Sequence, residues 1–282
     1  MSAAAATLGA ARRGPRAGLL PYVDVFRLGF VETLAYRSQI WMRLVLVPLT
    51  AAFQYFIFAA LYASGPEVMG GHRLAEIAGY VALMQTLRTL FANNISIFIG
   101  EAIRTGQIAT YLLRPLAFPW FAMSYIAGRG ASQVFTMGVP TLIGFALVGA
   151  LPAPPDAGTF VAFLLLTLAA FLLYNLAFTM AGLIGFFVEF SGELAWSVEL
   201  ILMLLGGATI PLSFFPAWLA RPLELLPTSF IYYVPAEAYL GRIDGPHLVG
   251  AVAIAWTWVV VGFLGVRRFY ELGRRHISIQ GG

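Results

Sequence analysis

Few residues of this chain combine a reactive side chain with a position where chemistry could occur. Arg88 lies near the middle of the apolar stretch Leu74–Ile99, and Glu199 lies early in the stretch Leu194–Ile210. An arginine at the centre of a bilayer costs roughly 3 kcal/mol on insertion scales, so Arg88 should face protein or water and pair with an acid. Glu199 is the best partner by residue type. Such a pair would either line a transport path or fix helix packing, and the sequence leaves both roles open.

Two amides, Asn93 and Asn94, follow Arg88 along the same stretch. Adjacent positions on a helix point about 100° apart, so at most one of the two can face a central path while the other bonds to a neighbouring helix. For this pair the pattern favours interhelical hydrogen bonding over a role in lining a path.

Other kinds of chemistry lack the residues they need. The chain has no Lys and no Cys, which excludes a P-loop ATP site and thiolate chemistry. The three histidines, His72, His247 and His276, lack the spacing of metal ligands and are expected at membrane–water interfaces. Ser191 and Ser213 lack the flanking residues of a nucleophile elbow. The acids Asp24, Asp156 and Asp244 stand too far apart in the sequence to form a magnesium cluster. We therefore expect no catalytic residue, no cofactor and no metal site in this chain.

A charged island interrupts the apolar sequence from Gly100 to Pro115. It contains Glu101, Arg104 and Gln107 and ends in Arg114 and Pro115. The island is therefore a candidate contact surface for a soluble partner. The alternative is a solvated loop whose Glu101–Arg104 pair contributes a few tenths of a kcal/mol, about 0.3.

These features are embedded in a membrane composition. Of 282 residues, 60% are hydrophobic and 11% are charged, whereas soluble domains carry about 25% charged residues. A bilayer span needs about 20 apolar residues, and the sequence predicts an all-α polytopic protein with six transmembrane helices. The predicted spans are Ile40–Ala63, Leu74–Ile99, a third that begins late after Leu116 and ends near Leu151, a fourth within Thr159–Val188, Leu194–Ile210 and His247–Val266.

The regions outside the spans divide the chain into three parts. Residues 1–17 are rich in Ala, Gly and Arg and are expected to form a disordered cytoplasmic tail, residues 18–268 the permease domain, and residues 269–282 a cytoplasmic C-terminal tail. Within the domain, charges are too frequent between Pro21 and Ser38 for a span, so a helix in the membrane interface is predicted there.

Residues 205–242 carry Gly and Pro too closely spaced for one straight helix. Short broken helices are predicted at the membrane surface, before the last span. The residues that break them are Gly206, Gly207, Pro211, Pro216, Pro227 and Pro235.

The arginines orient the protein. With the N-terminus inside, eleven arginines fall on the inner side and only Arg73, Arg221 and Arg242 on the outer side; the eleven are Arg12, Arg13, Arg16, Arg27, Arg37, Arg104, Arg114, Arg267, Arg268, Arg274 and Arg275. Because positive residues accumulate in cytoplasmic loops, both termini and the charged island are predicted to be cytoplasmic. The excess of arginine is therefore interpreted as a topology signal and not as a sign of nucleic-acid binding.

Two stretches together resemble the permease subunit of ABC-2 type ABC exporters. One is I-G-E-A-I-R-T-G-Q-I-A-T-Y-L-L-R-P-L from Ile99 to Leu116, which is similar to the cytoplasmic coupling helix between spans two and three. The other is G-G-A-T-I-P-L-S-F-F-P-A-W-L from Gly206 to Leu219, with P-T-S-F-I-Y-Y-V-P-A-E-A-Y-L-G from Pro227 to Gly241, similar to the broken extracellular helices before span six. The resemblance covers nearly the whole chain.

The resemblance implies partners and a mechanism. Two permeases, identical or different, would surround a central path, and separate ABC ATPase subunits would bind ATP and Mg²⁺. They would dock on Glu101, Arg104 and Gln107, which would share one helix face at positions i, i+3 and i+6, and on Arg114, which with Pro115 would begin the return to the membrane. Closure of the ATPases would then tilt the spans between inward-facing and outward-facing states, which requires different contacts in the two states.

The resulting hypothesis is an exporter permease in the bacterial plasma membrane that moves an amphipathic or hydrophobic molecule such as a drug or lipid. The alternative is an ATP-independent channel or secondary transporter in which Arg88 and Glu199 relay ions or protons. The Gly/Pro-broken region has no counterpart in the first half of the chain, and this lack of an inverted repeat argues against a secondary transporter. An accessory membrane subunit that moves nothing itself is a third possibility.

Overall fold

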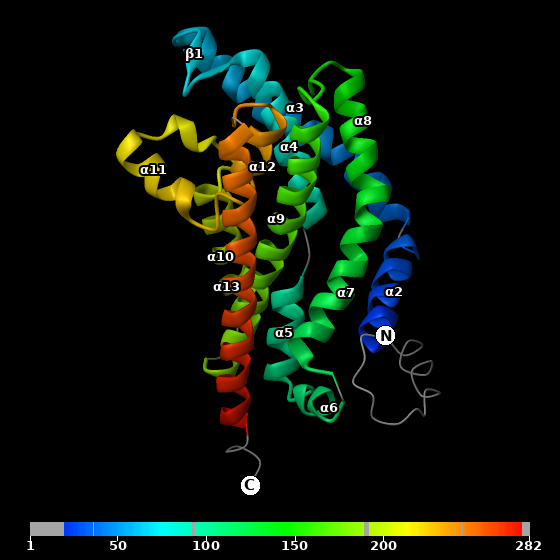
Figure 1. Ribbon diagram of the computed structural model, residues 1–282. Helices are drawn as coiled ribbons and strands as arrows, with labels where there is room; N and C mark the ends of the chain where they lie inside the picture. The colour runs from blue at the N-terminus through cyan, green and yellow to red at the C-terminus, as the bar shows by residue number, and fades with distance from the viewer. Residues whose placement is uncertain are drawn as a thin grey trace.

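The computed structural model describes residues 20–35, 37–91, 94–114, 116–188, 192–243 and 245–277. Apart from one small hairpin, its regular elements are helices, so the predicted all-α class is confirmed (Figure 1). In chain order the elements are α2 (Leu20–Ala35), α3 (Arg37–Ser64), β1 (Val68–Met69), β2 (His72–Arg73), α4 (Leu74–Phe91), α5 (Ile95–Arg104), α6 (Ile108–Leu112), α7 (Phe118–Gln133), the π-helix η2 (Val134–Gly138), α8 (Val139–Leu147), α9 (Ala157–Leu183), η3 (Ile184–Phe186), α10 (Gly192–Leu205), η4 (Leu212–Phe214), α11 (Ala217–Leu225), α12 (Tyr233–Tyr239) and α13 (Gly245–Ile277).

Four helical stretches in the described part are long and apolar enough to cross a membrane: Trp41–Ser64, Phe118–Leu147, Ala157–Phe186 and Gly245–Arg275. A multi-pass membrane protein is therefore supported, but helix length and hydropathy identify four spans in the described part and not the predicted six. α10 is apolar but has only 14 residues, or about 21 Å at the α-helical rise. The predicted second span is not one helix, because α4 ends at Phe91 and α5 begins at Ile95.

Three predicted boundaries were wrong. The third span does not begin late: its helix starts at Phe118, with Pro119 in the first turn, where a missing N–H is tolerated. The fifth helix ends at Leu205 instead of Ile210, because Gly207 takes a left-handed conformation with φ of 82°. The last helix does not stop near Val266 but continues to Ile277. In the part after Val266, Phe269 packs against Phe187 and Tyr270 against Phe186.

The third span contains an irregularity that its sequence explains. The π-helical turn Val134–Gly138 separates α7 from α8, and Pro140 follows it in the first turn of α8. Proline has no N–H to continue the helical ladder, and a π-turn is one way for a helix to accommodate that loss. The span thus stays continuous although its register changes.

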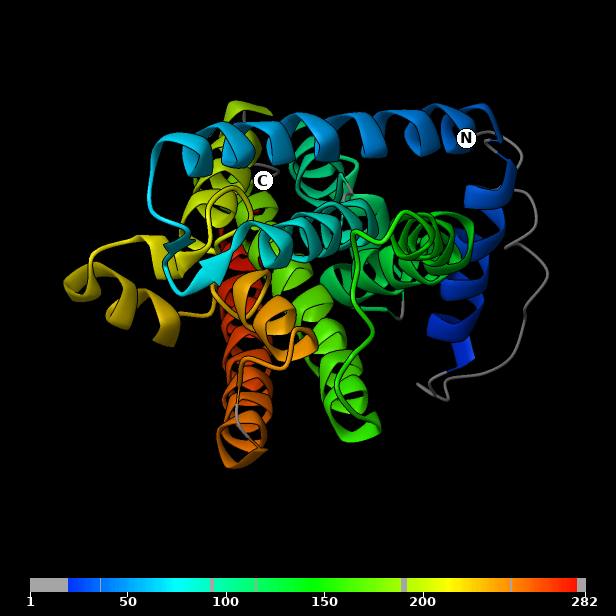
Figure 2. The same ribbon diagram turned by 90° about the horizontal axis from the view of Figure 1, so that it is seen from above.

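α4 lies at the centre of the bundle. Twelve of its 18 residues are buried, and Tyr80, Leu83 and Phe91 belong to the main hydrophobic core together with residues of α9 and α12. α3, by contrast, flanks the bundle, as Figure 2 shows from above. Most of its apolar side chains are exposed. A span with so much exposed apolar surface needs lipid or another protein around it.

The N-terminal helix α2 packs tightly on α7. A Cβ atom added to Gly128 would lie 1.9 Å from the carbonyl oxygen of Phe26, and one added to Gly29 would lie 2.1 Å from that of Tyr125. The two backbones therefore touch, as small residues allow in membrane helix pairs. The Tyr125 hydroxyl also donates a hydrogen bond to Glu32. α2 runs mainly across the long axis of the bundle (Figures 1 and 2), and its place in a membrane interface stays a prediction.

This close approach predicts the effect of a single methyl group. Gly128→Ala should destabilise the protein by about 1–3 kcal/mol, because the clash is with a backbone oxygen that cannot rotate away. Thermal unfolding in detergent measures it. Gly144→Ala is the control: its added Cβ meets nothing within 4 Å, so the better helix propensity of Ala should leave it neutral or stabilising. Equal midpoints for the two variants would contradict the α2–α7 contact.

Candidate functional site

Polar side chains from α3 and α4 meet near the middle of the span Trp41–Ser64. Gln85 Nε2 donates a hydrogen bond of 3.0 Å to Gln54 Oε1, and the Thr50 hydroxyl lies 3.4 Å from Gln85 Oε1. Gln54 Nε2 in turn donates to the carbonyl oxygen of Thr209 at 2.9 Å. A chain of amides therefore links α3, α4 and the irregular segment after α10.

Arg88 and Glu199 lie beside this chain of amides. Arg88 follows Gln85 by three positions on α4, which places it on the same side of the helix. Glu199 of α10 accepts a hydrogen bond of 2.5 Å from the Tyr174 hydroxyl of α9. Both charges interact electrostatically with Tyr174 and Tyr232, so the structure brings them into one neighbourhood.

The predicted ion pair itself is corrected. Although Arg88 and Glu199 both fall within the described residues, no nitrogen–oxygen distance between them is 4.0 Å or less. The physical reason is that Tyr174 and Tyr232 project from α9 and from the start of α12 into the same neighbourhood. The phenol of Tyr174 takes the place next to the carboxylate that the arginine was expected to fill.

We call Thr50, Gln54, Gln85, Arg88, Tyr174 and Glu199 the polar face. Gln54, Arg88 and Glu199 are half-buried and Thr50 is exposed, so the polar face opens on the surface of the single chain. Polar and charged groups at membrane depth are stable only against protein or water. This part of the surface is therefore unsuited to direct contact with lipid tails.

The predicted amides are not brought into the polar face. Asn93 lies outside the described residues. Asn94 precedes α5 and is exposed, and its backbone oxygen accepts from Phe98 N at 2.9 Å. Its side chain makes no capping hydrogen bond.

The charged island forms two short helices joined by a turn. Arg104 Nη2 and Nε donate to the two carboxylate oxygens of Glu101 at 2.6 and 3.0 Å, and both side chains are half exposed. These hydrogen bonds hold the pKa of Glu101 below its ordinary value. The assumption that one helix carries Glu101, Arg104 and Gln107 was wrong. Gly106 turns the chain with φ of 74°, and Gln107 caps the next helix, α6.

An aromatic cluster holds this segment in place. Tyr111 of α6 packs on Phe118 and Phe121 of α7 at ring-centroid distances of 4.7 and 5.4 Å, and Phe98 of α5 packs on Phe118 at 5.9 Å. The guanidinium of Arg114 lies 5.0 Å from the Tyr111 ring centroid. The island is therefore a packed structure and not a loose loop. Pro115 lies outside the described residues.

Sequence reasoning missed the most exposed large apolar side chain of this segment. Leu113 is 88% exposed between the charged pair and Arg114. A large apolar side chain so exposed at the tip of a rigid segment is typical of an anchor for a partner. An apolar residue next to Arg114 was the only available signal, and apolar neighbours are too common in this chain to single it out.

The predicted interruption of the helices after α10 is confirmed. Pro211 and Pro216 directly precede η4 and α11, Pro227 follows the end of α11, and Pro235 lies in the first turn of α12. Gly206 and Gly207 end α10, and the Tyr80 hydroxyl donates to the Gly207 oxygen at 2.6 Å. In Figure 1 α11 projects sideways from the bundle.

A buried ionic cluster near this interruption was also missed. His72 is fully buried within the protein, and its Nε2 lies 2.9 Å from Glu237 Oε1. Arg242 Nε donates to Glu237 Oε2 at 2.9 Å, and Arg242 Nη1 lies 3.3 Å from Glu76 Oε2. The partners stand up to 166 positions apart in the sequence, and no local pattern pairs them.

A groove of about 730 Å³ opens elsewhere, between the first turns of α9 and α13. Its lining is mainly apolar, with Asp156 at one end, and it contains none of the predicted site residues. Within the described residues, no three His, Asp or Glu side chains converge as a metal ion would require.

The polar face predicts the cost of removing one hydroxyl. Tyr174→Phe deletes the hydrogen bond to Glu199 and should destabilise the protein by about 1–3 kcal/mol, as is usual for bonds to charged groups. A thermal midpoint lower by a few degrees, about 2–8 °C, is expected. Tyr55→Phe is the matched control, since within the described residues the Tyr55 hydroxyl has no hydrogen bond. An unchanged midpoint for Tyr174→Phe would show that the bond contributes nothing.

Comparison with known protein families agrees with the resemblance drawn from the sequence. A family model described as ABC-2 family transporter protein matches residues 49–281, a range that includes the polar face, the charged island and the interrupted helices. A search of curated proteins returned no match. Because the family match covers well over half of the 282 residues, the chain belongs to the ABC-2 family of membrane transporter proteins.

Proposed function

We propose that this chain is the permease subunit of an ATP-driven exporter whose energy comes from separate ABC ATPase subunits. One observation carries the proposal: a rigid, charged and exposed segment, α5 to Arg114, at one end of a membrane transporter that has no P-loop in its sequence. ATP and Mg²⁺ would be bound by the partner chain. Members of the ABC-2 family normally work with such partners, which supports the proposal.

The contact with the ATPase would combine charge and apolar anchoring. Glu101, Arg104 and Gln107 would supply the polar contacts, with Leu113 entering an apolar pocket of the partner. The guanidinium of Arg114 packs on the Tyr111 ring, so Arg114 would lie at the edge of the ATPase contact and not at its centre. Because the aromatic cluster joins α5, α6 and α7, a push on α6 would be passed to the third span.

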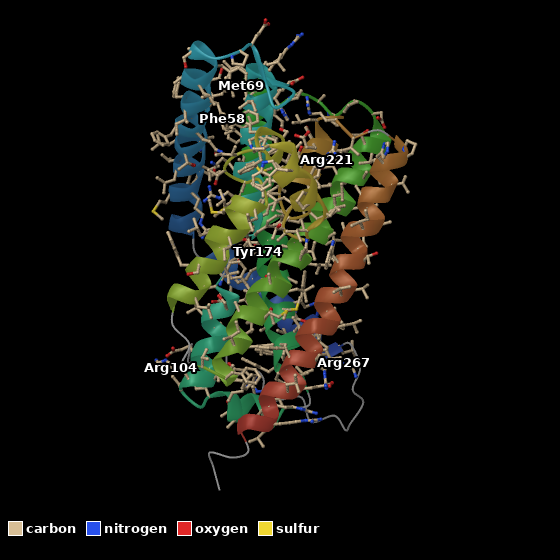
Figure 3. The ribbon with its side chains drawn as sticks, turned by 90° about the vertical axis from the view of Figure 1, so that its left-hand side faces the viewer. Phe58, Met69, Arg104, Tyr174, Arg221 and Arg267 are labelled. Atoms are coloured by element: carbon tan, nitrogen blue, oxygen red, sulfur yellow. The ribbon has the colours of Figure 1, made fainter. Side chains whose placement is uncertain are left out.

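The arrangement of charges supports a cytoplasmic position for this end. Figure 3 places Arg104 and Arg267 at one end of the molecule, with Met69 and Arg221 toward the other. Positive residues mark the cytoplasmic side, so we place α5, α6 and the end of α13 there, with both termini cytoplasmic, in a bacterial plasma membrane. In this topology α4 with α5 forms the second span and α10 the fifth, giving six.

The polar face would line the translocation path. Because it cannot face lipid tails, a second permease, identical or different, would cover it and enclose water and cargo between the two copies. Aromatic and apolar surface beside a few polar groups suits an amphipathic or hydrophobic molecule such as a drug or lipid. An ATP-independent channel or secondary transporter would use Arg88 and Glu199 as a relay without the charged segment, and the next experiment separates these alternatives.

Reversing the exposed ion pair tests the ATPase contact. The double variant Glu101→Arg with Arg104→Glu keeps the local pair but inverts its charges. Co-purification of the ATPase and its stimulated hydrolysis should fall at least about tenfold, equivalent to about 1.4 kcal/mol of binding. The matched control inverts the exposed pair Arg267–Glu271 of α13 in the same way. Normal ATPase binding by the Glu101/Arg104 variant would contradict the ATPase contact and favour the alternative of a solvated segment without a partner.

Removing the charge of Arg88 tests the path. Arg88→Met should leave assembly with the ATPase intact and lower ATP-driven transport of an amphipathic fluorescent dye at least about tenfold in inverted vesicles, since the polar lining loses its cation. Arg221→Met, on the exposed α11, is the control. Normal transport by Arg88→Met contradicts the lining role, and dye movement that follows an ion gradient without ATP favours the alternative transporter.

A further inference from the structure

The cluster around His72 contains more charge than packing alone requires. His72 is fully buried, and both of its ring nitrogens face oxygen atoms: Nε2 faces Glu237 Oε1 at 2.9 Å, and Nδ1 faces the Gly70 carbonyl at 3.1 Å. A carbonyl can only accept a hydrogen bond, and the Glu237 carboxylate already accepts from Arg242. Nδ1 also lies 3.4 Å from the Ser213 hydroxyl, so the imidazole has polar partners on both of its nitrogens.

The result is a row of four polar side chains. Glu237 lies between His72 and Arg242, Arg242 lies between Glu237 and Glu76, and each lies within 3.3 Å of the next. A buried ion pair is weak support for stability, because desolvation offsets its attraction, but breaking it by removing one partner leaves an uncompensated charge. Such a cluster has two defined states, joined or separated, and resists intermediate ones.

The cluster joins two units that are far apart in the sequence. His72 and Glu76 belong to the hairpin and α4, whereas Glu237 and Arg242 belong to α12 and the turn after it. Other contacts join the same two parts of the chain: the Phe214 ring packs against the His72 ring at a centroid distance of 6.3 Å, and Arg242 Nη2 donates to the Gly71 oxygen at 3.0 Å.

Glycines in left-handed conformations bound both units at this boundary. Gly70 and Gly71 turn the hairpin, while Gly207 and Gly241 lie on either side of the segment from η4 to α12. Glycine changes φ and ψ at little cost, so these positions suit movement of short segments as units. The stretch just before the segment is hydrogen-bonded to α3 and α4 through the carbonyl oxygens of Thr209 and Gly207, so movement of the segment would reach the polar face.

We propose that the cluster of His72, Glu237, Arg242 and Glu76 is an ionic latch that holds the interrupted segment, η4 to α12, against the hairpin and α4. The latch opens when the transporter changes state and closes again afterwards. This inference rests on the proposed function, because ATP supplies the change of state. The alternative is a permanent fastener that stays joined throughout the cycle.

Spin labels can measure the latch directly, because the chain has no cysteine of its own. Labels are attached in the double variant E67C/R221C, on exposed positions just before the hairpin and on α11. The distance between them is recorded in lipid nanodiscs, first for the full chain alone and then for its complex with the ATPase, trapped with ATP and vanadate. We expect one short distance in the resting chain and a second, longer one in the trapped complex.

Variants of the latch separate the two interpretations. Glu237→Gln should populate the longer distance without nucleotide, and Arg242→Gln, at the partly exposed end of the cluster, provides the same test if Glu237→Gln does not fold. Arg73→Gln is the control, since Arg73 is exposed on the same hairpin and its side chain is outside the cluster.

The outcomes distinguish failure of the latch from failure of the proposed function. If the ATPase binds and hydrolyses ATP but the distance stays short in the trapped complex, the cluster is a permanent fastener and the latch is wrong. If Glu237→Gln and Arg242→Gln both fold and keep the short distance, the latch is equally wrong. If no ATPase binds but both variants lengthen the distance, the ionic closure stands and the proposed function fails.

Discussion

Hydrocarbon offers no hydrogen bonds, and this constraint shapes the rest of the structure. Backbone groups satisfy it by forming helices, but side chains such as Gln54, Gln85 and Glu199 must find partners of their own. The structure supplies them through the amide chain between α3 and α4 and the phenol of Tyr174. Arg88 is half-buried and forms no ion pair within the described residues, so water or protein must meet it. The polar face is thus the side of the bundle that is unsuited to lipid tails.

α4 connects the features that matter for transport. Its first turn carries Glu76 of the ionic cluster, its middle carries Tyr80 and Gln85, and its last turn carries Arg88. α5, which comes next, leads to the exposed Glu101–Arg104 pair. One buried helix therefore contacts the interrupted segment, the polar face and, through its neighbour, the charged island. A displacement at either end has a short physical route to the other.

Rigid and adaptable regions alternate around this helix. α2 and α7 touch through Gly29 and Gly128, and α6 is packed by aromatic rings, so both are suited to passing force without deforming. The segment from η4 to α12 is different, because glycines and prolines divide it into short pieces, although α12 itself is buried in the hydrophobic core. Such a division between firm helices and short jointed segments is what alternating access requires of a transporter.

The sequence by itself determined the membrane class, the all-α fold, the interruption after α10 and the family resemblance, because apolar run length, Gly/Pro spacing and local motifs are local properties. It also located the charged island, but not the turn at Gly106 that separates Gln107 from Arg104, since a left-handed glycine is not visible in helical spacing. Only the tertiary structure placed Tyr174 beside Glu199, buried His72 against Glu237 and exposed Leu113. Those outcomes depend on which distant segments share a surface, and packing decides that.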